Sequence, residues 1–170
     1  MKVLVPLDRS DLKEIAVPAV RKLLAAAPDA ELHLMTVLDP RQVRGSADRE
    51  VDLVPAMPAG SIGPVIAPVK PRLVESHGEA MERVNLETCA ELQALAETEF
   101  AGTPVLVRTE WSRKPADKIV SVADAIDADV IVMATRARAG LGHIIGGSVT
   151  ESVVRKTSRP VLVVGPAFAG

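Results

Sequence analysis

The sequence predicts a single-domain α/β fold of the Rossmann type, a three-layer sandwich in which a parallel sheet lies between two layers of helices. Three observations support this prediction. Short apolar runs alternate along the chain with amphipathic segments of helical length, which is typical of a parallel sheet wound with right-handed crossovers. The runs are continuously apolar, as expected of strands covered by helices on both faces. The length of 170 residues suits one domain with one sizeable core.

The N-terminal part of the chain predicts a first strand, helix and second strand. The run KVLVPLD (2–8) is short and apolar, which indicates a buried strand. Asp11 and Glu14 then form a capping-box pattern ahead of an apolar stripe, which predicts a helix. Pro18 lies inside this helix and requires either a kink or a later start. The run ELHLMTVLD (31–39) predicts the second strand.

Residues 40–77 form an insert of different composition between the second strand and the second helix. They contain six prolines with glycines between them and show no helical or strand periodicity. A stretch of this length is typical of a functional lid, an interaction segment or a disordered region. Because it also contains many apolar residues, we expect part of it to pack over the ligand crevice or across a dimer, with residues 60–63 mobile.

The remainder of the chain predicts three more helices and three more strands. Ser76 and Glu79 form a capping box that opens the longest helix, roughly residues 77–101. TPVLVRTEW (103–111) predicts a strand, and Pro115 suits the first turn of the helix that follows it. The last elements are strands at 128–134 and 161–164 and, between them, a helix that opens with the capping pair Ser148 and Glu151.

Composition limits the function. A formal net charge of −2 predicts no polyanionic partner, and a single Trp with two Phe and no Tyr nearly excludes a base-stacking surface for nucleic acid. A single Cys89 excludes an intrachain disulfide and a cysteine-rich metal site. The chain shows no signal-peptide pattern and no apolar run of membrane-spanning length, so we expect a cytoplasmic protein without a membrane partner.

The loop after the fourth strand is the strongest candidate for ligand chemistry. In parallel sheets of this kind, ligands bind beyond the carboxyl ends of the strands, where the strand order reverses. Only the segment VIVMATRARAGLGHIIGGSVTESVV (130–154) combines a long loop of small residues with the start of a helix. Gly147 allows close backbone approach, Ser148 offers a hydroxyl, and Arg136 and Arg138 could bind a phosphate. The alternative is structural: Ser148 caps the helix and Gly147 serves its turn.

The loop fits neither of the common phosphate-binding fingerprints. Instead, PLDRS after the first strand, TVLD after the second and VMATRARAGLGHIIGGSVTESVVRKTSRPVLVV near the end resemble the universal stress protein family. The most specific piece of that family is G-x2-G-x9-G-[ST] after the fourth strand. Here it reads Ala134-x2-Ala137-x9-Gly147-Ser148, with the spacing intact and the first two glycines replaced by alanine.

The resemblance implies a sheet of order 3-2-1-4-5, usually in a dimer, and in the nucleotide-binding branch ATP across strands one and four, with Mg²⁺ as its possible companion. Carried over residue by residue, it places Asp8 at the ribose or adenine edge; Pro6, Leu7 and Val37 beside the adenine; Met133, Ala134, Arg136 and Ala137 along the ribose and phosphates; and Gly147, Ser148, Val149 and Thr150 at the phosphates. Arg138 adds a further positive charge there.

The alanine at position 137 opposes nucleotide binding more than the alanine at position 134. If position 137 needs a positive φ, alanine costs about 1–2 kcal/mol, and its methyl group would hinder the approach of a phosphate to the backbone. Ala134 closes a strand, where a methyl group is a small steric change. Gly147, Ser148 and Asp8 are retained and favour binding.

Three functions follow from these observations. The leading prediction is a dimeric regulatory protein that binds ATP and passes its state to a protein partner. The dimer is expected to form through strand five, whose apolar residues Val161 and Val163 lie at a sheet edge. The alternative is an interaction module that binds no nucleotide and acts through its dimer surface or insert. A slow ATPase ranks last, because the sequence shows no positioned general base: Asp39 and Glu110 are acids at strand ends whose geometry it does not give.

Overall fold

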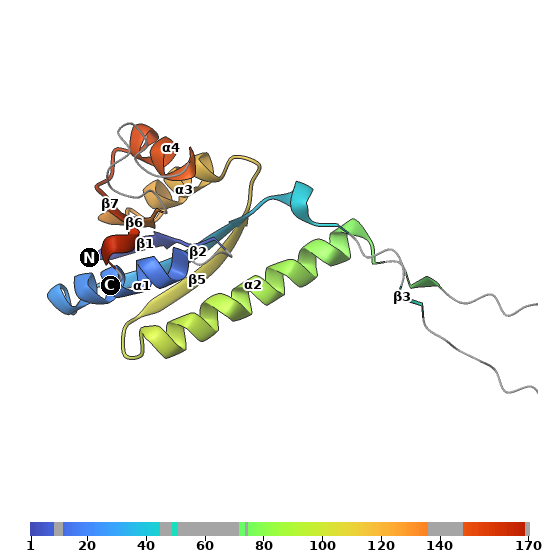
Figure 1. Ribbon diagram of the computed structural model, residues 1–170, viewed down its shortest axis with the longest axis horizontal. Helices are drawn as coiled ribbons and strands as arrows, with labels where there is room; N and C mark the ends of the chain where they lie inside the picture. Colours follow the sequence, from blue (N-terminus) through green and yellow to red (C-terminus); the bar gives the residue numbers. More distant parts are fainter. Residues whose placement is uncertain (9–11, 45–48, 51–71, 74, 136–147, 169–170) are drawn as a thin grey trace, which may run out of the picture.

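The computed structural model describes residues 1–8, 12–44, 49–50, 72–73, 75–135 and 148–168 (Figure 1). Its central element is a five-stranded sheet in which every neighbouring pair of strands is parallel. The strands lie in the order β5-β2-β1-β6-β7, which is the predicted order 3-2-1-4-5. Their bounds are β1 (Lys2–Pro6), β2 (Glu31–Leu38), β5 (Val105–Trp111), β6 (Val130–Ala134) and β7 (Val161–Val164).

Two helices cover each face of the sheet (Figure 1). The helices α1 (Leu12–Ala26) and α2 (His77–Glu99) lie on one face, and α3 (Pro115–Ala125) and α4 (Ser148–Lys156) lie on the other. This division follows from the strand order: the chain passes from β1 to β2 and β5 in one direction, then to β6 and β7 in the other, and right-handed crossovers place the two sets of helices on opposite faces.

The three central strands, β1, β2 and β6, are buried on both faces, which explains their continuous apolar runs. Val3 and Val5 of β1 pack in the core beneath α1 and α2, whereas Leu4 between them packs in the core beneath α3 and α4. This alternation is the period of two that a strand imposes on its side chains. The sheet therefore separates two apolar cores, one on each face.

Local sequence chemistry sets the start of two helices as predicted. The Ser76 hydroxyl accepts a hydrogen bond from the backbone N–H of Glu79 at 3.2 Å, and the Glu79 carboxylate accepts one from the N–H of Ser76 at 2.7 Å. Pro115 is the first residue of α3. In contrast, α1 begins at Leu12, well before Pro18, so the later start considered for this helix is wrong.

The two ends of the insert are joined by a short pair of antiparallel strands that the sequence did not indicate. A short 3-10 turn (Pro40–Gln42) follows β2, and β3 (Arg49–Glu50) then pairs in antiparallel fashion with β4 (Arg72–Leu73) in a separate two-stranded sheet. Strands of two residues carry no periodicity that a sequence pattern could reveal. The expectation of mobility at residues 60–63 lies outside the described residues.

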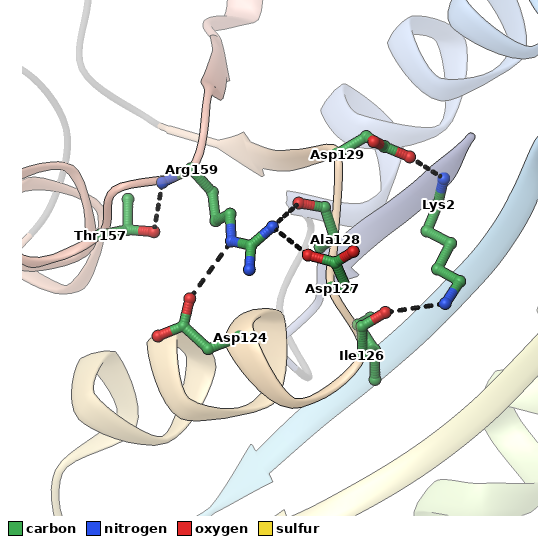
Figure 2. A network of polar contacts seen from close by, with 8 residues as sticks. All are labelled: Lys2, Asp124, Ile126, Asp127, Ala128, Asp129, Thr157 and Arg159. Atoms are coloured by element: carbon green, nitrogen blue, oxygen red, sulfur yellow. Dashed lines mark hydrogen bonds and ion pairs between the residues drawn. The ribbon is translucent and has the colours of Figure 1, made fainter.

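A polar network at the amino edge of the sheet links segments that are distant in sequence (Figure 2). The Arg159 guanidinium donates to the carboxylates of Asp124 and Asp127, at 3.2 Å and 2.6 Å, and to the carbonyl of Ala128 at 3.2 Å. Beside it, the backbone N–H of Lys2 donates to the Asp129 carboxylate at 2.6 Å. The network joins the end of α3, the segment before β7 and the starts of β1 and β6.

Asp127 occupies a position that only a few residue types tolerate. Its φ is 55°, in the left-handed region, where aspartate is accepted more readily than bulky or β-branched residues. The hydrogen bond from Arg159 lowers the pKa of the Asp127 carboxyl below its ordinary value. Because the pKa is lower in the folded state, this contact stabilises the protein above the ordinary pKa and is lost as the pH falls.

We expect Arg159→Met to lower the free energy of unfolding at pH 7, because it removes the charge and hydrogen bonds but keeps an apolar side chain of similar length. The difference from the wild type should shrink as the pH falls below the ordinary pKa of an aspartate toward the lowered pKa of Asp127, because the ion pair is lost when Asp127 is protonated. Urea unfolding at pH 7 and pH 3 measures both effects. Arg155→Met is the control, because Arg155 is highly exposed and pairs only within α4, with Glu151, among the described contacts. An equal loss in both variants would contradict the prediction.

Candidate functional site

The candidate site lies where the strand order reverses, at the carboxyl ends of β1 and β6. These strands are neighbours, with Val3 opposite Val130 and Leu4 opposite Ile131. From β1 the chain continues to one side of the sheet, and from β6 it continues to the other, so the two crossovers diverge at this point. A crevice at such a reversal is the usual ligand site in open α/β sheets.

Three residues at the end of β1, Pro6, Leu7 and Asp8, were predicted to contact the nucleotide, and only Asp8 is exposed. Pro6 lies opposite Met35 of β2, and the N–H of Leu7 donates to the Met35 carbonyl at 2.7 Å, which continues the ladder by one residue. The Leu7 side chain is buried in the core beneath α1 and α2. Asp8 is exposed at the edge of the sheet and is the polar group that β1 offers to a ligand.

The predicted residues of β2 and β6 lie at the same edge but contribute mainly to packing. Met133 is buried beneath α3 and α4, and Ala134 is buried beneath α1 and α2. Val37 is half-buried against the α3 and α4 core. The N–H of Thr135 donates to the Val164 carbonyl at 2.8 Å, so the chain stays in the sheet until this point. These side chains position the crevice and leave little surface for a ligand.

Ala134 lies within β6. Among the described non-glycine residues only Asp127 has a positive φ, so the φ of Ala134 is not positive. The first glycine-to-alanine replacement of the motif therefore carries no backbone strain.

The helix α4 begins at the same edge. Its first residue is Ser148, its next residue Val149 packs against the α3 and α4 core, and Thr150 is buried with 5% of its surface exposed. Burial of Thr150 opposes the predicted contact of its hydroxyl with a phosphate. The backbone N–H groups of the first turn and the helix dipole favour an anion here. The predicted residues Arg136, Ala137, Arg138 and Gly147, and the side chain of Ser148, lie outside the described part of the structure.

The predicted site residues that the structure describes line two separate hollows. A hollow of about 870 Å³ lies between α1 and α2 and reaches Leu7 and Asp8 at one end. A smaller one of about 290 Å³ lies between α3 and α4 and includes Val149 and Lys114. The loop 136–147, which joins β6 to α4, falls outside the described residues. The groove between α1 and α2 was not predicted, because it depends on the separation of two helices and not on a local pattern.

The two acids considered as general bases are both engaged in ion pairs. Asp39 caps the turn after β2, accepts a hydrogen bond from the N–H of Arg41 at 3.0 Å, and pairs with the Arg41 guanidinium. The side-chain and backbone hydrogen bonds from Arg41 lower the pKa of Asp39 to about 2. Glu110 pairs with Lys118 at 3.5 Å. A carboxylate with a pKa of about 2 is poorly matched to proton abstraction near neutral pH.

The described residues contain no group of three or more His, Cys, Asp or Glu side chains placed to hold a metal ion. None of the helices formed by these residues is long and apolar enough to cross a membrane.

Comparison with known proteins gives consistent matches along the chain. The sequence profile of the universal stress protein family matches residues 1–165. Universal stress protein MJ0577 of Methanocaldococcus jannaschii is 29% identical over 163 residues, which cover 96% of this chain and 93% of that protein. Universal stress protein MJ0531 of the same organism is 32% identical over 165 residues, which cover 96% of this chain and 81% of that protein.

Solved structures share the fold. The structure of MJ0577 has a TM-score of 0.66 at 27% identity and covers 96% of this chain and 94% of its own. The universal stress protein of Archaeoglobus fulgidus in complex with dAMP has a TM-score of 0.56 at 19% identity, with 96% and 97% covered. A universal stress protein in complex with cAMP has a TM-score of 0.57 at 23% identity, with 97% and 96% covered.

We expect Arg41→Gln to raise the pKa of Asp39 from about 2 toward its ordinary value of 3.8, because the side-chain hydrogen bond and the positive charge are lost. The pH titration of the Asp39 carboxyl by NMR measures this change. Arg44→Gln, a little further along the same segment, is the control and should leave the titration unchanged. A titration of Asp39 that is the same in the wild type and in Arg41→Gln would contradict the ion pair.

Proposed function

Because this chain belongs to the universal stress protein family, we propose that it is a dimeric regulatory protein that binds ATP at the carboxyl ends of β1 and β6. The observation that carries the proposal is the reversal of strand order between β1 and β6, with the exposed Asp8 on one side and the first turn of α4 on the other. The two relatives solved with dAMP and cAMP share this fold, which makes an adenine nucleotide the ligand to test first.

Each part of the site would hold a different part of the nucleotide. The Asp8 carboxylate is an acceptor suited to ribose hydroxyls, and the N–H groups at the start of α4 are suited to phosphate oxygens. Arg136 and Arg138 would add positive charge, and the Ser148 hydroxyl a further donor. Mg²⁺ usually retains several waters and is held largely by the phosphates, so it would need few protein ligands here.

We place the protein among binding proteins and not among hydrolases. Asp39 and Glu110, the two acids considered as general bases, are each held in an ion pair, which does not favour a role in proton abstraction. The binding of nucleotide would instead change the state that a protein partner detects. The second candidate, an interaction module without nucleotide, is favoured by one observation: the motif holds alanine at position 137, where a glycine is expected.

Isothermal titration with ATP, with and without Mg²⁺, tests the nucleotide. We expect Asp8→Ala to weaken binding, and Ser148→Ala to weaken it by about 1–3 kcal/mol because a hydrogen bond to a charged phosphate is lost. Ala137→Gly should strengthen binding, since it restores backbone freedom and removes a methyl group. Asp29→Ala is the control, because Asp29 is exposed in the turn before β2, at the opposite edge of the sheet.

Two results would count against this account. If neither the wild type nor Ala137→Gly takes up ATP, the interaction module without nucleotide becomes the better description. If ATP binds but Ala137→Gly leaves its affinity unchanged, the cost assigned to the second alanine is wrong.

The dimer is proposed to form through β7. This strand is at one edge of the sheet and is hydrogen-bonded to β6 on its other side. Leu162 is 40% exposed, and Val161 and Val163 are half-buried, so the edge is apolar and accessible to a second copy. An apolar edge strand readily pairs with another chain, and a twofold axis would bury the same residues of both.

We expect Val163→Lys to give monomers in sedimentation, because a charge would be placed at the centre of the shared edge. Leu106→Lys is the matched control: it introduces the same charge at an exposed apolar residue of β5, the other edge strand. Dimers that persist in Val163→Lys, or that are lost in Leu106→Lys instead, would place the interface elsewhere.

A further inference from the structure

The groove between α1 and α2 is a large hollow lined by described residues, and the nucleotide proposal uses only one end of it. It has a volume of about 870 Å³. Its floor and walls are mainly apolar, and its upper edges carry charged side chains. The floor includes the buried residues Leu7, Thr36, Thr88 and Leu92, and the walls include the half-buried Val17, Pro18 and Leu95.

The sheet order produces the groove. α1 contacts β6 and β7, whereas α2 contacts β2 and β5, so the two helices stand apart over the middle of the sheet. One ion pair spans the gap at its far end, where the Arg21 guanidinium binds the Glu99 carboxylate at 2.8 Å and the Glu99 carbonyl at 3.1 Å. The other end reaches Asp8 and the proposed nucleotide site.

The charged side chains that line the groove carry a net negative charge. Among the described residues that line it are four carboxylates, from Asp8, Glu14, Glu91 and Glu99, and one guanidinium, from Arg21, which is already bound to Glu99. The edges of the groove are therefore suited to a partner that brings positive charge.

We propose that this groove binds an amphipathic helix of a partner protein, with an apolar stripe facing the floor and lysine or arginine residues on both flanks. At a rise of about 1.5 Å per residue, the α1 wall from Glu14 to Arg21 is about 10 Å long and the α2 wall from Thr88 to Glu99 about 16 Å long. These lengths match two to three turns of a helix, roughly the length of a helix-in-groove anchor pattern. A helix with one apolar and one polar side suits a groove with an apolar floor and charged edges.

This inference deepens the proposed function by naming the chemistry of the partner, and it rests on that function only for its link to the nucleotide. Asp8 belongs both to the end of the groove and to the proposed nucleotide site. A nucleotide that engages Asp8 changes the charge at the end of the groove, so ATP and the helix should alter each other's affinity by the same factor.

The probe is a synthetic peptide of roughly 14 residues, made of leucine and lysine, with the leucines at the helical spacing i, i+3, i+4, i+7. Two peptides control for composition and charge: one has the same residues in scrambled order, and one has glutamate in place of lysine. Fluorescence anisotropy with the labelled peptides, first without nucleotide, should show binding of the leucine–lysine helix alone.

Variants locate the binding. Glu91→Lys reverses a charge at the groove edge and Leu95→Asp places a charge on its wall, so each should weaken peptide binding by about tenfold. Glu97→Lys is the matched control: it makes the same change on the same helix, but Glu97 is outside the groove and bonded to Gln93. Circular dichroism of each variant verifies the fold, and Glu91→Lys is an exposed change that the fold should tolerate.

Equal binding of the scrambled peptide, or equal weakening of peptide binding by Glu97→Lys and Glu91→Lys, would contradict the proposal that the groove binds a helix. The proposal is also wrong if dodecyltrimethylammonium binds in the groove and the peptide does not, because this would indicate a small-molecule site. If the protein binds ATP but not the peptide, the proposal of a helix-binding groove is wrong. If it binds the peptide but not ATP, the nucleotide proposal is wrong and the helix-binding groove is supported.

Discussion

The right-handed crossover between parallel strands is the constraint on which the rest of this structure depends. Because each crossover turns the same way, the single change of direction after β5 moves the helices from one face of the sheet to the other. The same change of direction separates the chain segments that follow β1 and β6, and it leaves α1 and α2 apart over the middle of the sheet. The candidate nucleotide crevice and the unpredicted groove thus have one topological origin.

The sequence was sufficient where the information is local. Continuous apolar runs located all five strands of the main sheet, and the Ser76 and Glu79 pair located the start of α2 through a contact between near neighbours. It was insufficient where structure depends on distant segments. The Arg159 network joins residues more than 30 positions apart, and no pattern in the sequence predicts which acid an arginine will reach.

The candidate site shows the same limit. The family resemblance correctly implied the strand order that brings the ends of β1 and β6 together. It could not show that Met133, Ala134 and Thr150 would be buried in packing contacts. The face of α2 that packs on the sheet buries Ala80, Thr88, Leu92 and Ala96, three of which are small. Small residues allow a helix to lie close to a sheet, and hydrophobicity alone does not identify them.

The Arg159 network has a consequence for how such a chain can diverge. It fastens the amino edge of the sheet, whereas the candidate site, the insert and the open end of the groove are all associated with the carboxyl edge. Substitutions at the carboxyl edge can therefore change the candidate site without loosening the contacts that hold the framework. A lineage built in this way can change its ligand while the fold is inherited intact.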